Sequence, residues 1–279
     1  MASPTTRRFV DRAVRGACLG ATILALLPLL SVLGMVTLRG AEGLSLSFFS
    51  DLPKPVGEPG GGMAHALVGS LQIVGLACLM GIPAGVMAGI YLAEFGSSRF
   101  GRFVRFAADV MAGVPSIAVG VFVYVLVVRH TGGFSAFAGA LALSLLMLPT
   151  ITRSTEELLK LVPEALREAA LGLGVPQWRA TLRVMLRTAA PGIATGIMLA
   201  VARAMGETAP LLFTSFNNRF WATSPTEPTA SLPVTIYTYA VSPYADWHAQ
   251  AWAAALVLVS CVLLLNIAAR VLVRGKFRH

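Results

Sequence analysis

The run from Gly16 to Leu38 contains no charged side chain and is long enough to cross a lipid bilayer as a helix, since a spanning helix needs about 20 mostly apolar residues. A cleaved signal peptide has a shorter apolar region of about 7–15 residues, so we expect this run to remain as the first membrane helix. The composition agrees: 56% of the residues are hydrophobic and 13% are charged, whereas a soluble domain has about 25% charged residues.

Five further apolar runs give six candidate spans in a single membrane domain. The six runs cover Gly16–Leu38, Ala66–Leu92, Val110–Val128, Ala136–Ile151, Ala189–Phe213 and Trp252–Leu272. The even number places both termini on one side of the membrane. The predicted organisation is an N-terminal segment (1–15), a transmembrane domain (16–272) and a tail (273–279).

Lysine and arginine are distributed unevenly among the connecting segments. Seventeen of the 22 fall on the side of the termini, whereas the opposite side holds only Arg39, Lys54, Arg129 and Arg219. Lys and Arg are enriched in cytoplasmic loops, so both termini are predicted to be cytoplasmic. A net charge of +9 would indicate nucleic-acid binding in a soluble protein, but membrane topology accounts for it here.

Several kinds of chemistry have no support in the sequence. There is no P-loop, so ATP hydrolysis is expected on another chain, and no H-E-x-x-H or G-x-S-x-G motif supports protease or esterase chemistry. Cys18, Cys78 and Cys261 lie inside apolar runs, where thiols behave as small hydrophobic groups. We expect a chain that is not an enzyme and that binds no metal, cofactor or nucleic acid.

The predicted cytoplasmic segment 152–188 contains signals for a short separate helix. Pro163 suits the first helical position, EALREAALGLG alternates apolar and charged faces at helical spacing, and Gly172 and Gly174 can end the helix. The expected apolar face comprises Ala165, Ala169, Ala170 and Leu173. Such a face either binds another protein or packs on the membrane domain.

The predicted outer segment 214–250 mixes prolines with the apolar run LPVTIYTYAV. That run is too short to span a membrane. It is expected to form a helix at the interface or over the end of the bundle, or else part of a packed loop.

The sequence EAALGLG resembles the EAA signature of the membrane subunits of ABC importers. The matching residues are Glu168, Ala169, Ala170 and Gly174. The resemblance implies an all-α integral membrane protein with six transmembrane helices and the type I ABC importer permease (MetI-like) fold. It also implies that these four residues couple the chain to a separate ATPase.

The family pattern continues to Ile-x-Leu-Pro, and this chain departs from it. Val184 and Leu186 fit the apolar positions, but Arg187 stands where the proline is expected, and Pro191 follows four residues later. The helix break that this proline implies is therefore expected within about one turn of its usual place.

Three further stretches, GVPSIAVG, ARAMGETAPLLFT and SLPVTIYTYAVSP, resemble the permease subunits of phosphate importers in the ABC class. This resemblance implies ATP-driven import of inorganic phosphate across the bacterial inner membrane. It implies as partners a second permease subunit, an ATPase dimer and a periplasmic or lipid-tethered phosphate-binding protein. The alternatives are a permease for sulfate or molybdate and, less favoured, a regulatory membrane protein.

Arg203 and Glu207 lie four residues apart inside the fifth predicted span, so they can pair on one helical face. Such a pair either fixes helix packing or serves function, as charges inside membrane segments commonly do. The resemblance favours a translocation path in which Arg203 donates to the anion, because a guanidinium matches phosphate geometry, and Glu207 limits how tightly the anion binds. Arg153 either attracts the anion near the exit or is an ordinary cation on the cytoplasmic side.

Overall fold

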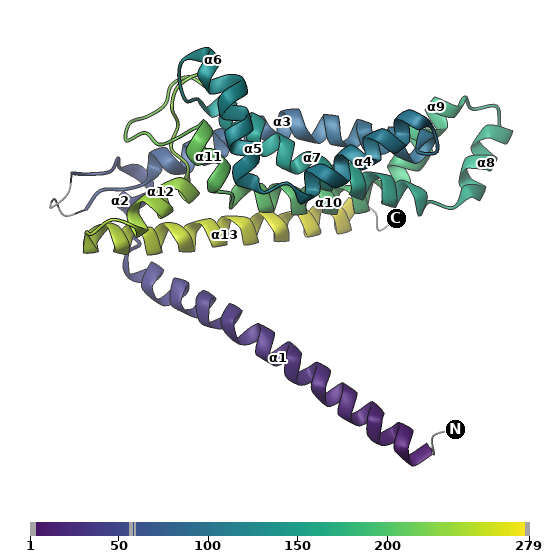
Figure 1. The fold of residues 1–279 in the computed structure, drawn as a ribbon, viewed down its shortest axis with the longest axis horizontal. Coiled ribbons are helices and arrows are strands. Elements are labelled where there is room, and N and C mark those ends of the chain that lie inside the picture. The colour runs from purple at the N-terminus through teal and green to yellow at the C-terminus, as the bar shows by residue number, and fades with distance from the viewer. Residues whose placement is uncertain (1–3, 56–57, 59, 277–279) are drawn as a thin grey trace.

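The computed structural model describes residues 4–55, 58 and 60–276, and every regular element among them is a helix (Figure 1). The centre of the bundle comprises α3 (Ala64–Phe95), α7 (Ala136–Lys160) and α10 (Leu186–Met205). The long helix α13 (Ala245–Lys276) packs along α10. This arrangement confirms the predicted all-α class.

Five helices are long and apolar enough to cross a membrane, and a bent pair would make a sixth span. They are Val10–Glu42, Ala64–Phe95, Ala136–Lys160, Gln177–Met205 and Ala245–Ala268, with the bent pair Arg99–Gly113 and Ser116–Thr131. Each overlaps one predicted run. The fourth run was predicted to end at Ile151, but its helix continues to Lys160, because the charged side chains of the added turns pair with one another or with a neighbouring helix.

The helices α3 and α7 approach each other closely. A Cβ atom on Gly85 would lie 2.8 Å from Cβ of Ile151, a separation that real atoms do not tolerate. Glycine permits this approach because it has no side chain. Ile73, Leu143 and Met147 are buried in the core around this contact, so the α3–α7 pair is the tightly packed centre of the molecule.

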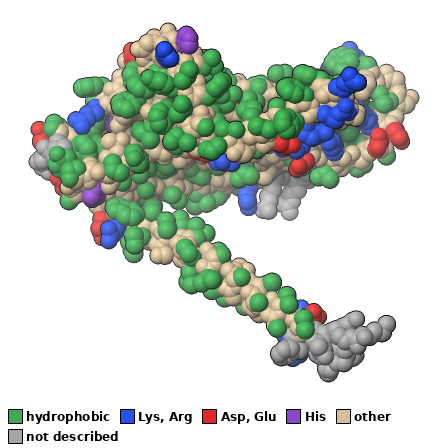
Figure 2. Space-filling model, in the orientation of Figure 1, with side chains coloured by type: hydrophobic (Ala, Val, Ile, Leu, Met, Phe, Trp, Pro, Cys, Tyr) green, Lys and Arg blue, Asp and Glu red, His purple; other side chains and the backbone are tan. Residues whose placement is uncertain are grey.

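The first helix, α1 (Pro4–Glu42), diverges from the bundle (Figure 1). Its C-terminal end contacts α13, where the guanidinium of Arg39 lies 5.5 Å from the ring centroid of Trp252. Its apolar side chains are otherwise largely exposed, as Figure 2 shows. An apolar surface of this extent must be covered by lipid or by another protein.

The run predicted to be continuous over Val110–Val128 is instead part of a bent pair of helices. Helix α4 (Arg99–Gly113) ends before Pro115, and α5 (Ser116–Val123) leaves at 106° to it. Proline disfavours helical geometry in the residue before it, and Val114 is extended with φ −72° and ψ 130°. After α5 the chain continues through the π-helix η1 (Tyr124–Val128) to α6 (Arg129–Thr131).

The fifth span also differs from the predicted run Ala189–Phe213. It begins earlier, with α9 (Gln177–Arg179) and the π-helix η2 (Ala180–Met185), and continues through α10 to Met205. The helix passes through Arg187 and Pro191 without ending, so the break expected near this proline is not found. The break lies instead at Gly206–Thr208, before α11 (Ala209–Thr214).

Helix α12 (Leu232–Ala240) covers one end of the bundle, beside α2 (Leu46–Ser50) (Figure 1). Its backbone is fixed to α3, because the amide of Leu232 donates to Oγ of Ser70 at 2.7 Å. The rings of Tyr239 and Trp247 stack with centroids 4.3 Å apart, which joins α12 to α13. The predicted run LPVTIYTYAV is therefore a helix that caps the bundle.

Candidate functional site

Arg203 and Glu207 lie at the break between α10 and α11. Arg203 is in the last turn of α10, whereas Glu207 is in the non-helical connection. Nε of Arg203 lies 3.5 Å from Oε1 of Glu207, and the two side chains are 67% and 17% exposed. The predicted pairing is present, but the two residues do not share one continuous helix.

The arginine faces away from the core of its own chain. Its neighbours Val201 and Ala204 are buried in the core together with Leu211 of α11. Among the described residues none accepts a hydrogen bond from the Nη atoms of Arg203. These donors are therefore available to a ligand or to another subunit.

Two discontinuous helices meet beside this pair. Helix α11 packs against α5, and a Cβ atom on Gly120 of α5 would lie 2.6 Å from Cα of Pro210. Broken helices inside membrane proteins commonly form substrate sites, because they expose backbone polar groups at mid-membrane depth. The pair thus lies in a part of the fold suited to binding a polar substrate.

Arg153 has a different environment. Its guanidinium contacts Asp109 of α4 at 2.5 Å and Glu156 of α7 at 3.2 Å. Glu156 is 1% exposed and also pairs with Arg105 of α4 and with Lys160. These contacts show a structural role that neither expectation for Arg153 included, because the side chain joins α7 to α4. The sequence does contain a signal for these ion pairs, namely the i, i+3 and i+7 spacing of Arg153, Glu156 and Lys160. This spacing lies beyond the predicted end of the span.

The short helix predicted after Pro163 is confirmed as α8 (Glu164–Gly172). Gly174 has a φ of +80°, which fits a glycine that ends a helix. Glu168 and Ala169 are exposed, but Ala170 is buried. Ala170 was expected on the exposed face; it is covered because α8 packs against η2.

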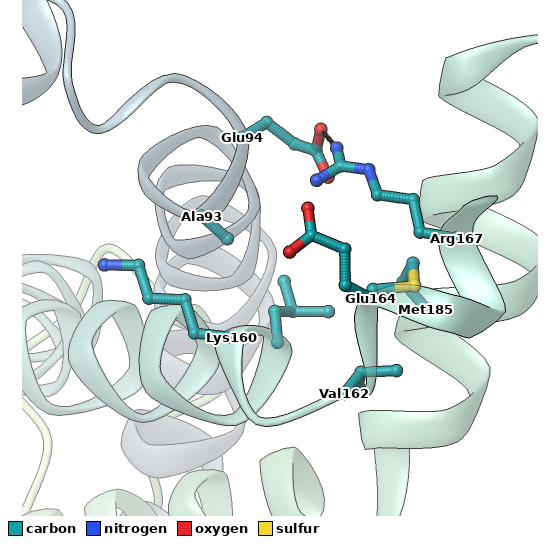
Figure 3. A pocket seen from close by; sticks show the side chains of 8 residues that line it. Ala93, Glu94, Lys160, Val162, Glu164, Arg167 and Met185 are labelled. Atoms are coloured by element: carbon teal, nitrogen blue, oxygen red, sulfur yellow. Dashed lines mark hydrogen bonds and ion pairs between the residues drawn. The ribbon is translucent and has the colours of Figure 1, made fainter.

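Glu94 is a further candidate residue, which no sequence pattern indicates. It lies at the end of α3, and its carboxylate accepts hydrogen bonds from Arg167, Gln177 and Thr181. Figure 3 shows Glu94 and Arg167 facing each other across the space between α3 and α8. A single glutamate near the end of an apolar run gives no spacing pattern, so its partners required the structure.

No group of three or more potential metal ligands occurs within residues 4–55, 58 and 60–276. The candidate site consists of charged side chains and helix breaks. Arg203 and Arg153 differ in their surroundings: the Arg203 side chain is 67% exposed, whereas that of Arg153 is 34% exposed and paired with Asp109.

Comparison with known proteins identifies relatives along most of the chain. Residues 81–278 match the family model described as "Binding-protein-dependent transport system inner membrane component". The phosphate transport system permease protein PstA of Yersinia pestis is 46% identical over 97% of this chain and 92% of its own length. PstA of Xylella fastidiosa strain 9a5c is 48% identical over 85% of this chain and 84% of its own length.

Solved structures show the same fold at low sequence identity. A chain of a bacterial alginate ABC transporter, in complex with a pentasaccharide-bound periplasmic protein, matches with a TM-score of 0.70 at 15% identity, covering 98% of each chain. A chain of the inward-facing MetNI methionine ABC transporter matches with a TM-score of 0.60 at 20% identity, covering 77% of this chain and 94% of that one. The predicted type I importer permease fold is thereby confirmed.

Proposed function

Because the chain belongs to the family of binding-protein-dependent transport system inner membrane components, we propose that it is a permease subunit for ATP-driven import of inorganic phosphate. Support for phosphate comes from relatives at 46% and 48% identity that are phosphate transport system permeases. The structural feature that carries the proposal is the exposed guanidinium of Arg203 beside a helix break.

The proposed orientation places both termini and α8 in the cytoplasm of a bacterium, with the bundle in its inner membrane. Lys and Arg mark cytoplasmic segments, and they gather at the α8 end of the molecule (Figure 2). Arg167, Arg179 and Arg183 lie in α8, α9 and η2. The opposite end, with α2 and α12, then faces the periplasm.

The proposed machine has three kinds of partner. A PstC-like permease completes the translocation path, two copies of a PstB-like ATPase hydrolyse ATP, and a periplasmic or lipid-tethered PstS-like protein delivers phosphate. The absence of a P-loop in this sequence supports a separate ATPase. Exposed Glu168 and Ala169 on α8 support a docking surface for it.

The path is proposed to pass Arg203. An anion that crosses a low-dielectric region needs compensating charge, because an isolated buried ion is very costly. Arginine supplies this charge together with donors in a fork that matches phosphate oxygens. Glu207, which is 3.5 Å away, competes for the same donors and keeps the anion from binding too tightly to leave.

The test is transport by the complete complex in proteoliposomes. Vesicles that contain both permeases, the ATPase and the binding protein are expected to accumulate radiolabelled phosphate only with ATP, and vesicles without this chain are the control. Unlabelled sulfate and molybdate are added as competitors. Vesicles that accumulate labelled sulfate or molybdate with ATP, but not labelled phosphate, would contradict a phosphate permease and favour another oxyanion.

A further inference from the structure

One carboxylate on α3 contacts three other segments, at the end of the bundle that we place in the cytoplasm. Glu94 belongs to α3, whereas its donors come from α8 (Arg167), α9 (Gln177) and η2 (Thr181). Nε2 of Gln177 lies 3.1 Å from Oε2, Oγ1 of Thr181 lies 3.1 Å from Oε1, and Arg167 pairs with Oε2. Both carboxylate oxygens are therefore occupied.

The contact is shielded from solvent. The Glu94 side chain is 9% exposed and that of Arg167 is 25% exposed. A carboxylate at this depth is stable only when it is paired and hydrogen-bonded. The direct connection between α8 and α3 is consequently a charged contact that is costly to break.

Direct apolar packing between α3 and α8 does not provide this connection; an indirect apolar route runs through η2, which packs against both helices. A cavity of about 160 Å³ separates them, lined on its apolar side by Ala93, Leu159, Val162 and Met185 (Figure 3). Close-packed side chains transmit a displacement from one helix to the next because protein interiors have low compressibility. A cavity between two helices does not transmit such a displacement. The Glu94–Arg167 pair bridges this space.

We propose that Glu94 is the positioning residue that transmits movement of the ATPase-docking helix to the transmembrane bundle. The proposal rests on the proposed function, because it presupposes an ATPase that docks on α8. When α8 moves, Arg167 displaces the end of α3 through Glu94, and α3 moves together with the tightly packed α7. The same carboxylate is hydrogen-bonded to Thr181 of η2, so η2 and the fifth span move together with α3.

The decisive measurement is the amount of phosphate transported per ATP hydrolysed. Glu94→Gln removes the charge but leaves the exposed surface of α8 unchanged. The variant complex is expected to assemble and to hydrolyse ATP, with phosphate transported per ATP lowered about tenfold, within the range of allosteric coupling. Thr181→Val removes one of the three donors at constant shape and is expected to lower the ratio about twofold. Glu157→Gln, an exposed glutamate on α7, is the control and should match the wild type.

The charge-exchanged variant separates positioning from folding. Glu94→Arg with Arg167→Glu restores an ion pair at this position and is expected to recover most of the transport per ATP. Wild-type coupling in Glu94→Gln overturns the proposal. So does failure of both Glu94→Gln and the exchanged variant to assemble, because Glu94 would then serve folding alone. Failure of the proposed function is distinguishable, since the wild-type complex itself would not import phosphate.

Discussion

Arg153 on α7 and Asp109 on α4 form an ion pair with 2.5 Å between Nη2 and Oδ1. The same guanidinium contacts buried Glu156, which also binds Arg105 of α4. Each of the two helices therefore contributes one arginine and one carboxylate to the contact between α4 and α7. Because its donors are shared between these carboxylates, we infer that Arg153 fixes the α4–α7 contact.

Glu156→Ala is expected to destabilise the protein by about 1.5–3 kcal/mol, because it removes charged hydrogen bonds from a buried carboxylate, whereas the cations left behind are 29–51% exposed and stay partly solvated. The loss is measured by thermal unfolding of the purified protein in detergent. Glu157→Ala alters the exposed neighbour of Glu156 and is expected to unfold at the wild-type temperature. Equal unfolding temperatures for the two variants would show that the network contributes little.

A matched pair of glycines tests the end of α8. Gly172 and Gly174 both have open space where a Cβ atom would lie, but only Gly174 has a positive φ, at +80°. Gly174→Ala should cost about 1–2 kcal/mol through left-handed backbone strain and weaken co-purification of the ATPase. Gly172→Ala lies in helical geometry and should leave co-purification unchanged. The idea fails if both variants retain the ATPase equally well.

Ala169→Arg tests the docking surface itself. Ala169 is exposed, so the variant protein should fold and insert, but burying an unpaired charge in the interface opposes docking. Phosphate uptake and ATPase co-purification should both be lost. The control is Leu161→Arg, at a position that is 76% exposed and lies before α8. Normal co-purification of the Ala169→Arg variant would count against docking on this face.

The orientation is tested by labelling from the two sides of the membrane. After replacement of the three native cysteines, Pro225→Cys is expected to react with an impermeant maleimide added to spheroplasts. Leu173→Cys, which is 85% exposed on the α8 side, should react only in inverted vesicles prepared from cells that lack the ATPase. Labelling of both from the same side would contradict the proposed topology.

The sequence predicted the elements whose signals are local. Pro163 and Gly174 bracket α8 because proline and glycine constrain their own backbone. The membrane runs were recognisable because each is long and apolar. The helix that passes Ile151 is longer than predicted, because the turns up to Lys160 carry charged side chains. Those charges are stabilised by ion pairs with Arg105 and Asp109, which lie on another helix and give no local signal in the sequence.

Breaks and charged contacts were harder to predict. Pro115 ends α4, whereas Pro191 lies inside α10, so a proline alone does not indicate where a span breaks. The partners of Glu94 are more than 70 residues away in sequence, and no local pattern in a single sequence indicates that such distant residues are in contact. The Arg203–Glu207 pair was predictable because its spacing is local, although the break between the two residues was not.

The role of Arg203 is tested by separating its charge from its shape. Arg203→Gln keeps an amide donor and removes the charge, so phosphate uptake is expected to fall about tenfold to a hundredfold, in line with about 1.5–3 kcal/mol for hydrogen bonds to charged groups. Arg203→Lys should recover only part of the uptake, because an ammonium group cannot donate bidentately. Glu207→Gln frees the guanidinium to hold the anion longer, which should slow turnover.

A purely structural pair predicts a different pattern. Removing either charge would then lower the amount of assembled complex, and the exchanged variant, Arg203→Glu with Glu207→Arg, would restore both assembly and uptake. Uptake is therefore normalised to assembled complex in every variant. In the proposed path the exchange moves the guanidinium from the exposed end of α10 to the position of Glu207, which is 17% exposed, so uptake should stay low although the pair is retained. Full recovery of uptake in the exchanged variant would exclude Arg203 as the residue that contacts the anion.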